Sequence, residues 1–131
     1  MAGFLIDTSV LIDAERGRGA LRRIPADDEH MISVITVSEL IHGVHRAVDA
    51  GIRLQRRVLV EHVLAELESI PLTIDVARVH AEIWAGLEAA GEIIGQHDLW
   101  IAATALVHGL QVVTTNAKDF KRVPRLPVLA L

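Results

Sequence analysis

The sequence contains no cysteine and very few aromatic residues, and each absence excludes a kind of chemistry. Without cysteine, the chain has no disulfide, no thiol nucleophile and no cysteine ligands for zinc. Aromatic residues make up 3% of the 131 residues, so base stacking cannot be a large part of any nucleic-acid binding. The lack of cysteine is compatible with a reducing cytoplasm, which is the compartment that we expect.

Long hydrophobic runs are also absent. No stretch approaches the roughly 18 to 20 apolar residues that a helix needs to cross a bilayer, so we expect no membrane association. Asp7 interrupts the start of the chain before an apolar segment develops, and we therefore expect no secretory signal. Hydrophobic residues still account for 51% of the chain, which excludes disorder. We expect one domain over residues 1–131, and a homodimer that covers part of this apolar surface.

Positive charge is in deficit. The chain has 13 lysine and arginine residues against 17 acidic ones, a formal net charge of −4. Nucleic-acid-binding proteins are usually basic, so this balance taken alone argues against a polyanionic partner.

Short apolar segments alternate with stretches of helical periodicity along the whole chain. This alternation predicts a three-layer α/β/α sandwich with a central, mainly parallel sheet. The expected strands cover residues 3–6, 31–34, 70–74, 112–114 and 128–129. The expected helices begin near Ser9, at Thr36, at Leu54, after a cap at Asp75, and at Gln96.

Four acidic residues fall where ligands bind in such a fold, beyond the carboxyl ends of the strands. They are Asp7, Glu39, Asp98 and Asp119. Each one alone could be a helix cap or a favourable charge in a first helical turn. Four carboxylates delivered to one edge would repel one another, and a divalent cation removes that conflict. Oxygen ligands without sulfur favour Mg²⁺, with Mn²⁺ as a substitute.

Four segments carry a resemblance to a known family. Residues 4–12 (FLIDTSVLI), 32–40 (ISVITVSEL), 97–105 (HDLWIAATA) and 115–120 (TNAKDF) are similar, in this order, to the motifs of PIN-domain ribonucleases. They span nearly the whole chain, which in size most resembles the VapC toxins of VapBC toxin–antitoxin pairs.

The resemblance implies a PIN-like fold and a Mg²⁺-dependent endoribonuclease that cleaves cellular RNA, tRNA or rRNA, and is inhibited by a cognate VapB-type antitoxin. Asp7, Glu39 and Asp98 match the three best-defined catalytic and metal-binding acids. Some members carry the fourth acid where this chain has Asn116, and others use the later position, here Asp119. We assign Asp119 to that role. The supporting residues implied by the motifs are Thr8, Thr36, Thr115 and Asn116.

A two-metal mechanism would place two cations about 4 Å apart, one activating a water and one stabilising the leaving oxygen. The four acids account for the whole net charge, because the remaining acidic residues equal the basic ones in number. The acidic balance therefore no longer excludes RNA.

Basic residues near the acids in sequence are interpreted as RNA-phosphate contacts. These are Arg16, Arg18, Arg22, Lys118 and Arg122. The group of Arg53, Arg56 and Arg57 is interpreted as an ordinary solvated surface, as is the histidine pair His42 and His45. Both tryptophans, Trp84 and Trp100, are expected in the core.

Three alternatives stay open. The chain could be a PIN-fold nuclease in RNA processing outside a toxin–antitoxin pair, or a catalytically silent binding module on the same fold. It could also be a Mg²⁺-binding receiver-like signalling domain, which normally has paired acids after its first strand. This chain has only Asp7 there. Metal-dependent RNA cleavage distinguishes the nuclease from the other two classes.

Overall fold

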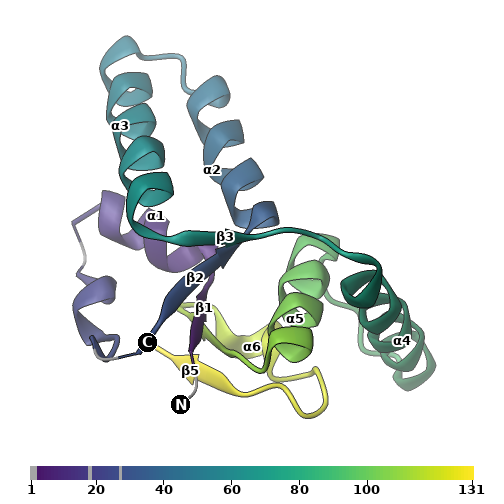
Figure 1. The fold of residues 1–131 in the computed structure, drawn as a ribbon. Helices are drawn as coiled ribbons and strands as arrows, with labels where there is room; N and C mark the ends of the chain where they lie inside the picture. The colour runs from purple at the N-terminus through teal and green to yellow at the C-terminus, as the bar shows by residue number, and fades with distance from the viewer. Residues whose placement is uncertain (1–2, 18, 27) are drawn as a thin grey trace.

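The fold is built on a sheet of five strands in the order β3-β2-β1-β4-β5 (Figure 1). The computed structural model describes residues 3–17, 19–26 and 28–131. Every neighbouring pair of strands is parallel. The carboxyl ends of all five strands therefore lie at the same edge of the sheet. The strands are β1 (Phe4–Ile6), β2 (His30–Ser33), β3 (Glu68–Ile70), β4 (Gln111–Thr114) and β5 (Val128–Ala130).

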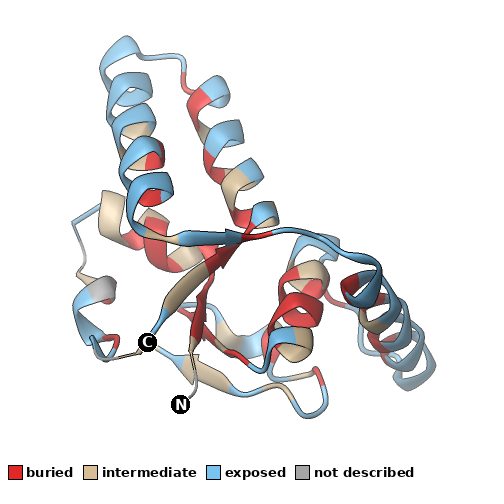
Figure 2. Ribbon diagram, viewed as in Figure 1, coloured by how far each residue is buried: buried red, intermediate tan, exposed pale blue. Residues whose placement is uncertain are grey.

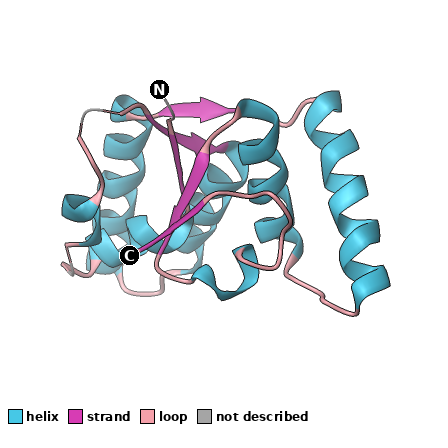
Figure 3. Ribbon diagram, turned by 90° about the horizontal axis from the view of Figure 1, so that it is seen from below, coloured by secondary structure: helices cyan, strands magenta, loops and turns pink. Residues whose placement is uncertain are grey.

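Helices cover both faces of this sheet (Figures 1 and 3). One face packs against α1 (Thr8–Glu15), α2 (Val34–Arg46) and α3 (Ala50–Glu66). The other packs against α4 (Ile74–Ala90), α5 (Gln96–His108) and α6 (Ala117–Phe120). A short 3₁₀ helix, Ala20–Arg23, follows α1. The expected three-layer α/β/α sandwich is confirmed, and its sheet is parallel throughout the described residues.

Strand alternation divides the core into two halves. In β1, Leu5 packs with the α4–α5–α6 layer, while Phe4 and Ile6 pack with the α1–α2–α3 layer. Val112 and Val113 of β4 divide in the same way. Successive side chains of a strand point to opposite faces, so a strand buried on both sides is apolar at every position.

Helix α5 is the most enclosed of the helices (Figure 2). Its buried positions are Leu99 and all five residues of 101–105. Three of these are alanines, whose small side chains let the helix axis approach the sheet closely. By contrast, α3 and α4 expose most of their outer surfaces (Figure 2). Within the described residues, no helix is both long and apolar enough to span a bilayer.

The boundaries of α2, α3 and α4 differ from those expected, and α3 begins at Ala50 instead of Leu54. The helix expected from Thr36 to Gly51 begins earlier, at Val34, and ends at Arg46. Asp49 then caps α3 by accepting a hydrogen bond from the backbone N–H of Ile52 at 2.9 Å. Apolar residues keep their helical spacing across the break, so periodicity does not locate it. The boundary is set by Asp49, because an Asp at this position satisfies a free backbone N–H of the next helix.

The residue that caps α4 is Thr73 and not Asp75. The Thr73 hydroxyl accepts a hydrogen bond from the N–H of Val76 at 3.2 Å. Asp75 lies inside the first turn, where its charge still interacts favourably with the helix dipole. Both residue types suit a cap, and the sequence alone did not distinguish the two positions.

Candidate active site

The four acids predicted from sequence come from four different elements near the carboxyl edge of the sheet. Asp7 follows β1 directly, and Glu39 lies in the second turn of α2 because that helix begins at Val34. Asp98 lies in the first turn of α5, and Asp119 lies on α6. The short helix α6 was not among the helices expected from the sequence.

Asp7 is a buried carboxylate held by hydroxyl groups. It occupies the N-cap position of α1 but makes no side-chain cap hydrogen bond. Its Oδ2 instead accepts hydrogen bonds from Ser9 Oγ at 2.7 Å and from Thr114 Oγ1 at 2.9 Å. Burial raises the pKa of Asp7, and these two hydrogen bonds oppose the rise. The simple helix-cap interpretation of Asp7 is therefore wrong.

Ser9 and Thr114 are in turn fixed by the backbone that follows β4. The N–H of Thr115 donates to Ser9 Oγ at 3.1 Å, and the N–H of Asn116 donates to Thr114 Oγ1 at 2.9 Å. Thr115 and Asn116 were proposed as supporting residues through their side chains, which are exposed. Thr115 and Asn116 instead contact Ser9 and Thr114 through their backbone N–H groups.

The sequence interpretation missed Ser9 and Thr114 as ligands of the buried carboxylate. The signal was present, because Ser9 lies two residues after Asp7 and Thr114 ends the strand adjacent to β1. Because β4 runs parallel to β1, the hydroxyl of Thr114 at the end of β4 can reach the carboxylate of Asp7 at the end of β1.

Glu39 is held by the hydroxyl of Thr8 and by a histidine. Thr8 Oγ1 donates to Glu39 Oε1 at 2.7 Å and lies 3.1 Å from Thr36 Oγ1. The other carboxylate oxygen, Oε2, lies 3.4 Å from His97 Nδ1. Thr8 and Thr36 are both buried. Of these two predicted supporting residues, Thr8 contacts Glu39 directly and Thr36 contacts Thr8.

Asp98 experiences the other three acids electrostatically. Its pKa is raised to about 6, first by partial burial and then by the negative charges of Asp7, Glu39 and Asp119. His97 opposes this rise. Charges act on one another in this way when the carboxylates lie in one region of the molecule.

Asp119 is paired with a residue that the sequence interpretation assigned to RNA. Arg122 Nη1 lies 3.5 Å from Asp119 Oδ1 and donates to the backbone oxygen of Ile93 at 3.1 Å. These contacts tie α6 to the loop that precedes α5. Arg122 thus partly neutralises the fourth acid in addition to any contact with phosphate.

The donor chemistry of this region fits a hard divalent cation, but the ligand cluster is not preassembled. Carboxylate and hydroxyl oxygens are ligands that Mg²⁺ and Mn²⁺ accept. Among the residues that the structure describes, however, no three acidic or histidine side chains converge on one metal position. Thr8 and His97 hold the two oxygens of Glu39. A cation shared by three acids therefore requires their side chains to move toward one another.

A cleft of about 550 Å³ opens beside Thr8 and Glu39. Helices α1, α2 and α3 form most of its wall, and His97 at the start of α5 closes one end. Most of its polar lining residues carry basic or titratable side chains. The polar lining residues are Arg16, Arg46, Arg56, His42, His97, Glu15, Glu39, Thr8 and Ser38.

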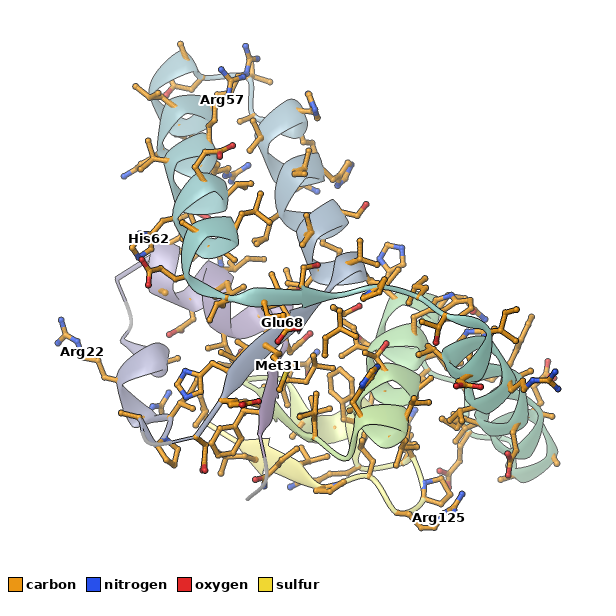
Figure 4. All side chains as sticks on the ribbon, in the orientation of Figure 1. Arg22, Met31, Arg57, His62, Glu68 and Arg125 are labelled. Atoms are coloured by element: carbon orange, nitrogen blue, oxygen red, sulfur yellow. The ribbon has the colours of Figure 1, made fainter. Side chains whose placement is uncertain are left out.

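Of the described residues predicted to contact RNA phosphates, one lines this cleft and others lie away from it. Arg16 lines it, whereas Arg22 and Lys118 are exposed, and Arg22 points outward from the 3₁₀ helix (Figure 4). Arg18 lies outside the described residues.

One arginine interpreted as ordinary surface also lines the cleft. Arg56 Nε lies 3.3 Å from Glu15 Oε1, and Arg56 Nη1 donates to the backbone oxygen of Gly43 at 2.9 Å. By contrast, Arg57 lies near the far end of the α2–α3 hairpin (Figure 4). The alternation of inward and outward faces along α3 separates these two neighbours.

The family model of the PIN domain matches residues 4–126 of this chain. A ribonuclease VapC from Rickettsia bellii is 37% identical over 129 residues, which cover 98% of this chain and 96% of that protein. The chain belongs to the PIN-domain family, among the VapC proteins. The receiver-like alternative is therefore not supported.

Solved structures of VapBC complexes share this PIN-domain fold. VapBC-5 from Mycobacterium tuberculosis matches with a TM-score of 0.83 and 32% identity, over 99% of this chain and 98% of that chain. VapBC2 from Rickettsia felis, bound to a DNA fragment from their promoter, matches with a TM-score of 0.86 and 27% identity, over 98% of each chain.

Proposed function

We propose that this PIN-domain protein is a Mg²⁺-dependent endoribonuclease and the toxin of a VapBC-type pair. The observation that carries the proposal is the electrostatic coupling of the acids, since Asp7, Glu39 and Asp119 together raise the pKa of Asp98. A divalent cation bound among these acids would relieve their mutual repulsion. Curated relatives named ribonuclease VapC support the same activity.

Asp7, Glu39, Asp98 and Asp119 are the residues that would hold the metal. When bound, Mg²⁺ supplies a Lewis acid that acidifies water and stabilises the charge that develops on the phosphodiester. Ser9 and Thr114 keep Asp7 oriented, and Thr8 keeps Glu39 oriented, before any RNA arrives. Because these contacts hold the acids apart in the metal-free protein, binding of a shared cation would rearrange at least some of them.

The cleft beside Glu39 provides a path for the RNA backbone. Arg16, Arg46 and Arg56 line it, and guanidinium groups bind phosphate oxygens in two-pronged hydrogen bonds. These contacts position a strand without reading its sequence. Exposed aromatic surface is scarce, so the cleft relies on phosphate and ribose contacts more than on stacking.

The antitoxin and the homodimer belong to the same proposal. Related proteins have been solved as VapBC complexes, which supports a VapB-type antitoxin as the partner of this chain. Large apolar side chains exposed on the helices and the loops between them provide surface for both contacts. The most exposed are Val48, Leu54, Val58, Ile74 and Ile93.

Expression in bacterial cells tests this function. The wild-type chain should stop growth and leave new RNA ends at one or a few positions in tRNA or rRNA, whereas Asp7→Asn should do neither. Coexpression of the gene neighbour that encodes the antitoxin should restore growth. RNA cleavage without growth arrest or antitoxin binding would favour a nuclease of RNA processing. Growth arrest with intact RNA would contradict the nuclease.

A further inference from the structure

A buried histidine on α4 lies behind the helix that carries Asp98. His80 is 5% exposed and points from α4 toward α5, outside the cluster of acids. Its ring stacks on that of Trp100, with 3.7 Å between centroids and 13° between planes. The ring of Trp84 meets His80 edge-on, with centroids 5.8 Å apart.

The same histidine reaches the first residue of α5. His80 Nε2 lies 3.2 Å from the side-chain oxygen of Gln96. Burial lowers the pKa of His80, so the neutral ring predominates at neutral pH. With its proton on Nε2, that ring donates a hydrogen bond to Gln96.

The contacts of His80 with Gln96 and Trp100 lie on the side of α5 opposite Asp98. Gln96 and Trp100 are four residues apart and therefore share one face of the helix. Asp98 shares the other face with Ala102 and Ala105, which are fully buried. If the first turn of α5 rotated about the helix axis, its contacts with His80 would break and Asp98 would be displaced at the same time.

The first turn of α5 has no side-chain cap of its own. The N-cap residue is Gly95, which provides no side chain to bind the free N–H groups. A glycine at this position also leaves the backbone freedom to move. The contacts of His80 with Gln96 and Trp100 compensate for this lack by anchoring the turn to α4.

We propose that His80 is a positioning residue, which fixes the first turn of α5 through Gln96 and Trp100 and thereby holds Asp98 toward the other acids. This inference rests on the proposed metal-dependent nuclease. His80 touches neither the acids nor the cleft, and it acts only through α5.

Two substitutions each remove the hydrogen bond between His80 and Gln96 and keep a side chain stacked on Trp100. His80→Phe keeps a flat ring against Trp100 and removes the donor to Gln96. Gln96→Met removes the acceptor from an exposed position and should leave the fold intact. His62→Phe, at an exposed histidine of α3, is the matched control (Figure 4).

The measurements are Mn²⁺ affinity by calorimetry without RNA, and kcat and KM for a short RNA with Mg²⁺. Both variants should bind Mn²⁺ about tenfold more weakly, as expected for residues that orient a metal ligand, and should lower kcat about tenfold with KM nearly unchanged. The double variant should lose no more than either single variant, because both remove the same contact. The control should match the wild type.

Wild-type Mn²⁺ affinity and kcat in a folded Gln96→Met protein would overturn the role of His80, whether or not His80→Phe folds. A rise in KM with unchanged kcat would also overturn it, because that pattern indicates RNA binding. A wild-type protein that cleaves no RNA contradicts the proposed nuclease itself. The two failures are thus distinguishable.

Discussion

At the scale of single residues, the site depends on how hydroxyl groups hold buried carboxylates. Asp7 is 5% exposed, and a bare charge at such a position is strongly unfavourable. Ser9 and Thr114 both donate to one of its oxygens, which lets the carboxylate persist there.

Replacement of Thr114 tests this arrangement. Thr114→Val removes a hydrogen bond that lowers the pKa of Asp7, so that pKa should rise further. The acidic limb of the profile of kcat/KM against pH should then move to higher pH. Cleavage at neutral pH should fall about tenfold, in the range seen when support of a metal ligand is lost.

Thr104→Val is the control for this experiment. Thr104 is equally buried, but its hydroxyl donates within α5 to the backbone oxygen of Trp100 at 2.8 Å. This variant should lose some stability and leave the pH profile in place. An unshifted profile in a folded Thr114→Val protein would show that Thr114 does not govern the ionisation of Asp7.

Asp98 should destabilise the metal-free protein at neutral pH. Its folded-state pKa of about 6 lies above the ordinary value of 3.8, so the folded state binds more protons between these values. Stability therefore falls as pH rises from about 4 to about 6. The full shift corresponds to roughly 3 kcal/mol, and solvent screening of this partly exposed group reduces it to about 1–2 kcal/mol.

Asp98→Asn removes this penalty. In EDTA at pH 7, the variant should unfold at a higher urea concentration than the wild type, and the difference should vanish near pH 4. Addition of Mg²⁺ should stabilise the wild type more than the variant. A variant that is less stable than the wild type at pH 7 would contradict the raised pKa.

The sequence was a good guide to the acids and a poor guide to their surroundings. Strand order predicts the placement of Asp7 and Glu39, because parallel strands end at one edge. Asp98 follows no strand, and the apolar stripe that it shares with Ala102 and Ala105 on α5 predicts that it faces the sheet. The roles of Ser9 and Arg56 depend on which side chains meet across elements that are distant in the chain. Trp84 was expected in the core, yet it is 44% exposed, since α4 buries only its inner face.

At the scale of helices and strands, the spacing of apolar residues predicted nearly every element. The exact ends of the helices depend on their capping residues. Helix α5 was expected to stop at Gly109, and this glycine is its C-cap, with a φ of 63°. Such a left-handed conformation favours glycine. The break between α2 and α3 was expected between Gly51 and Leu54 but lies between Arg46 and Ala50, because apolar residues recur on both sides of it.

The Asp49 cap should therefore contribute measurably to α3. Asp49→Ala leaves the N–H of Ile52 without its partner and should lower the free energy of unfolding by about 1 kcal/mol. Urea denaturation followed by circular dichroism measures this change. Glu61→Ala, at an exposed position inside α3, should change stability by less than half as much, and equal losses in the two variants would refute the cap.

At the scale of the whole molecule, the fold explains the acidic balance of the chain. A parallel sheet gathers the ends of all its strands at one edge, and the net charge of −4 equals the charge of the four acids placed there. Arginines lie in the adjacent cleft, so the surface offers positive side chains beside the proposed metal site. Under the proposed function, this arrangement predicts that the weakly acidic protein binds RNA when metal is present.

RNA affinity should accordingly depend on the metal more than on the protein alone. An end-labelled RNA titrated with Asp98→Asn, which we expect not to cleave, should bind weakly in EDTA. The acids repel phosphate, so binding should tighten on addition of Mg²⁺ as far as the other three acids retain the ion. Equal binding with and without Mg²⁺ would indicate that the basic residues of the cleft suffice.

Cleavage of a labelled RNA by the purified protein tests the central claim most directly. The wild type should cleave in Mg²⁺, stop when EDTA is added, and recover when excess Mg²⁺ or Mn²⁺ is restored. Folded Asp98→Asn protein purified in parallel should be inactive under all three conditions. Cleavage that persists in EDTA, or full activity in Asp98→Asn, would contradict a metal-dependent nuclease built on these four acids.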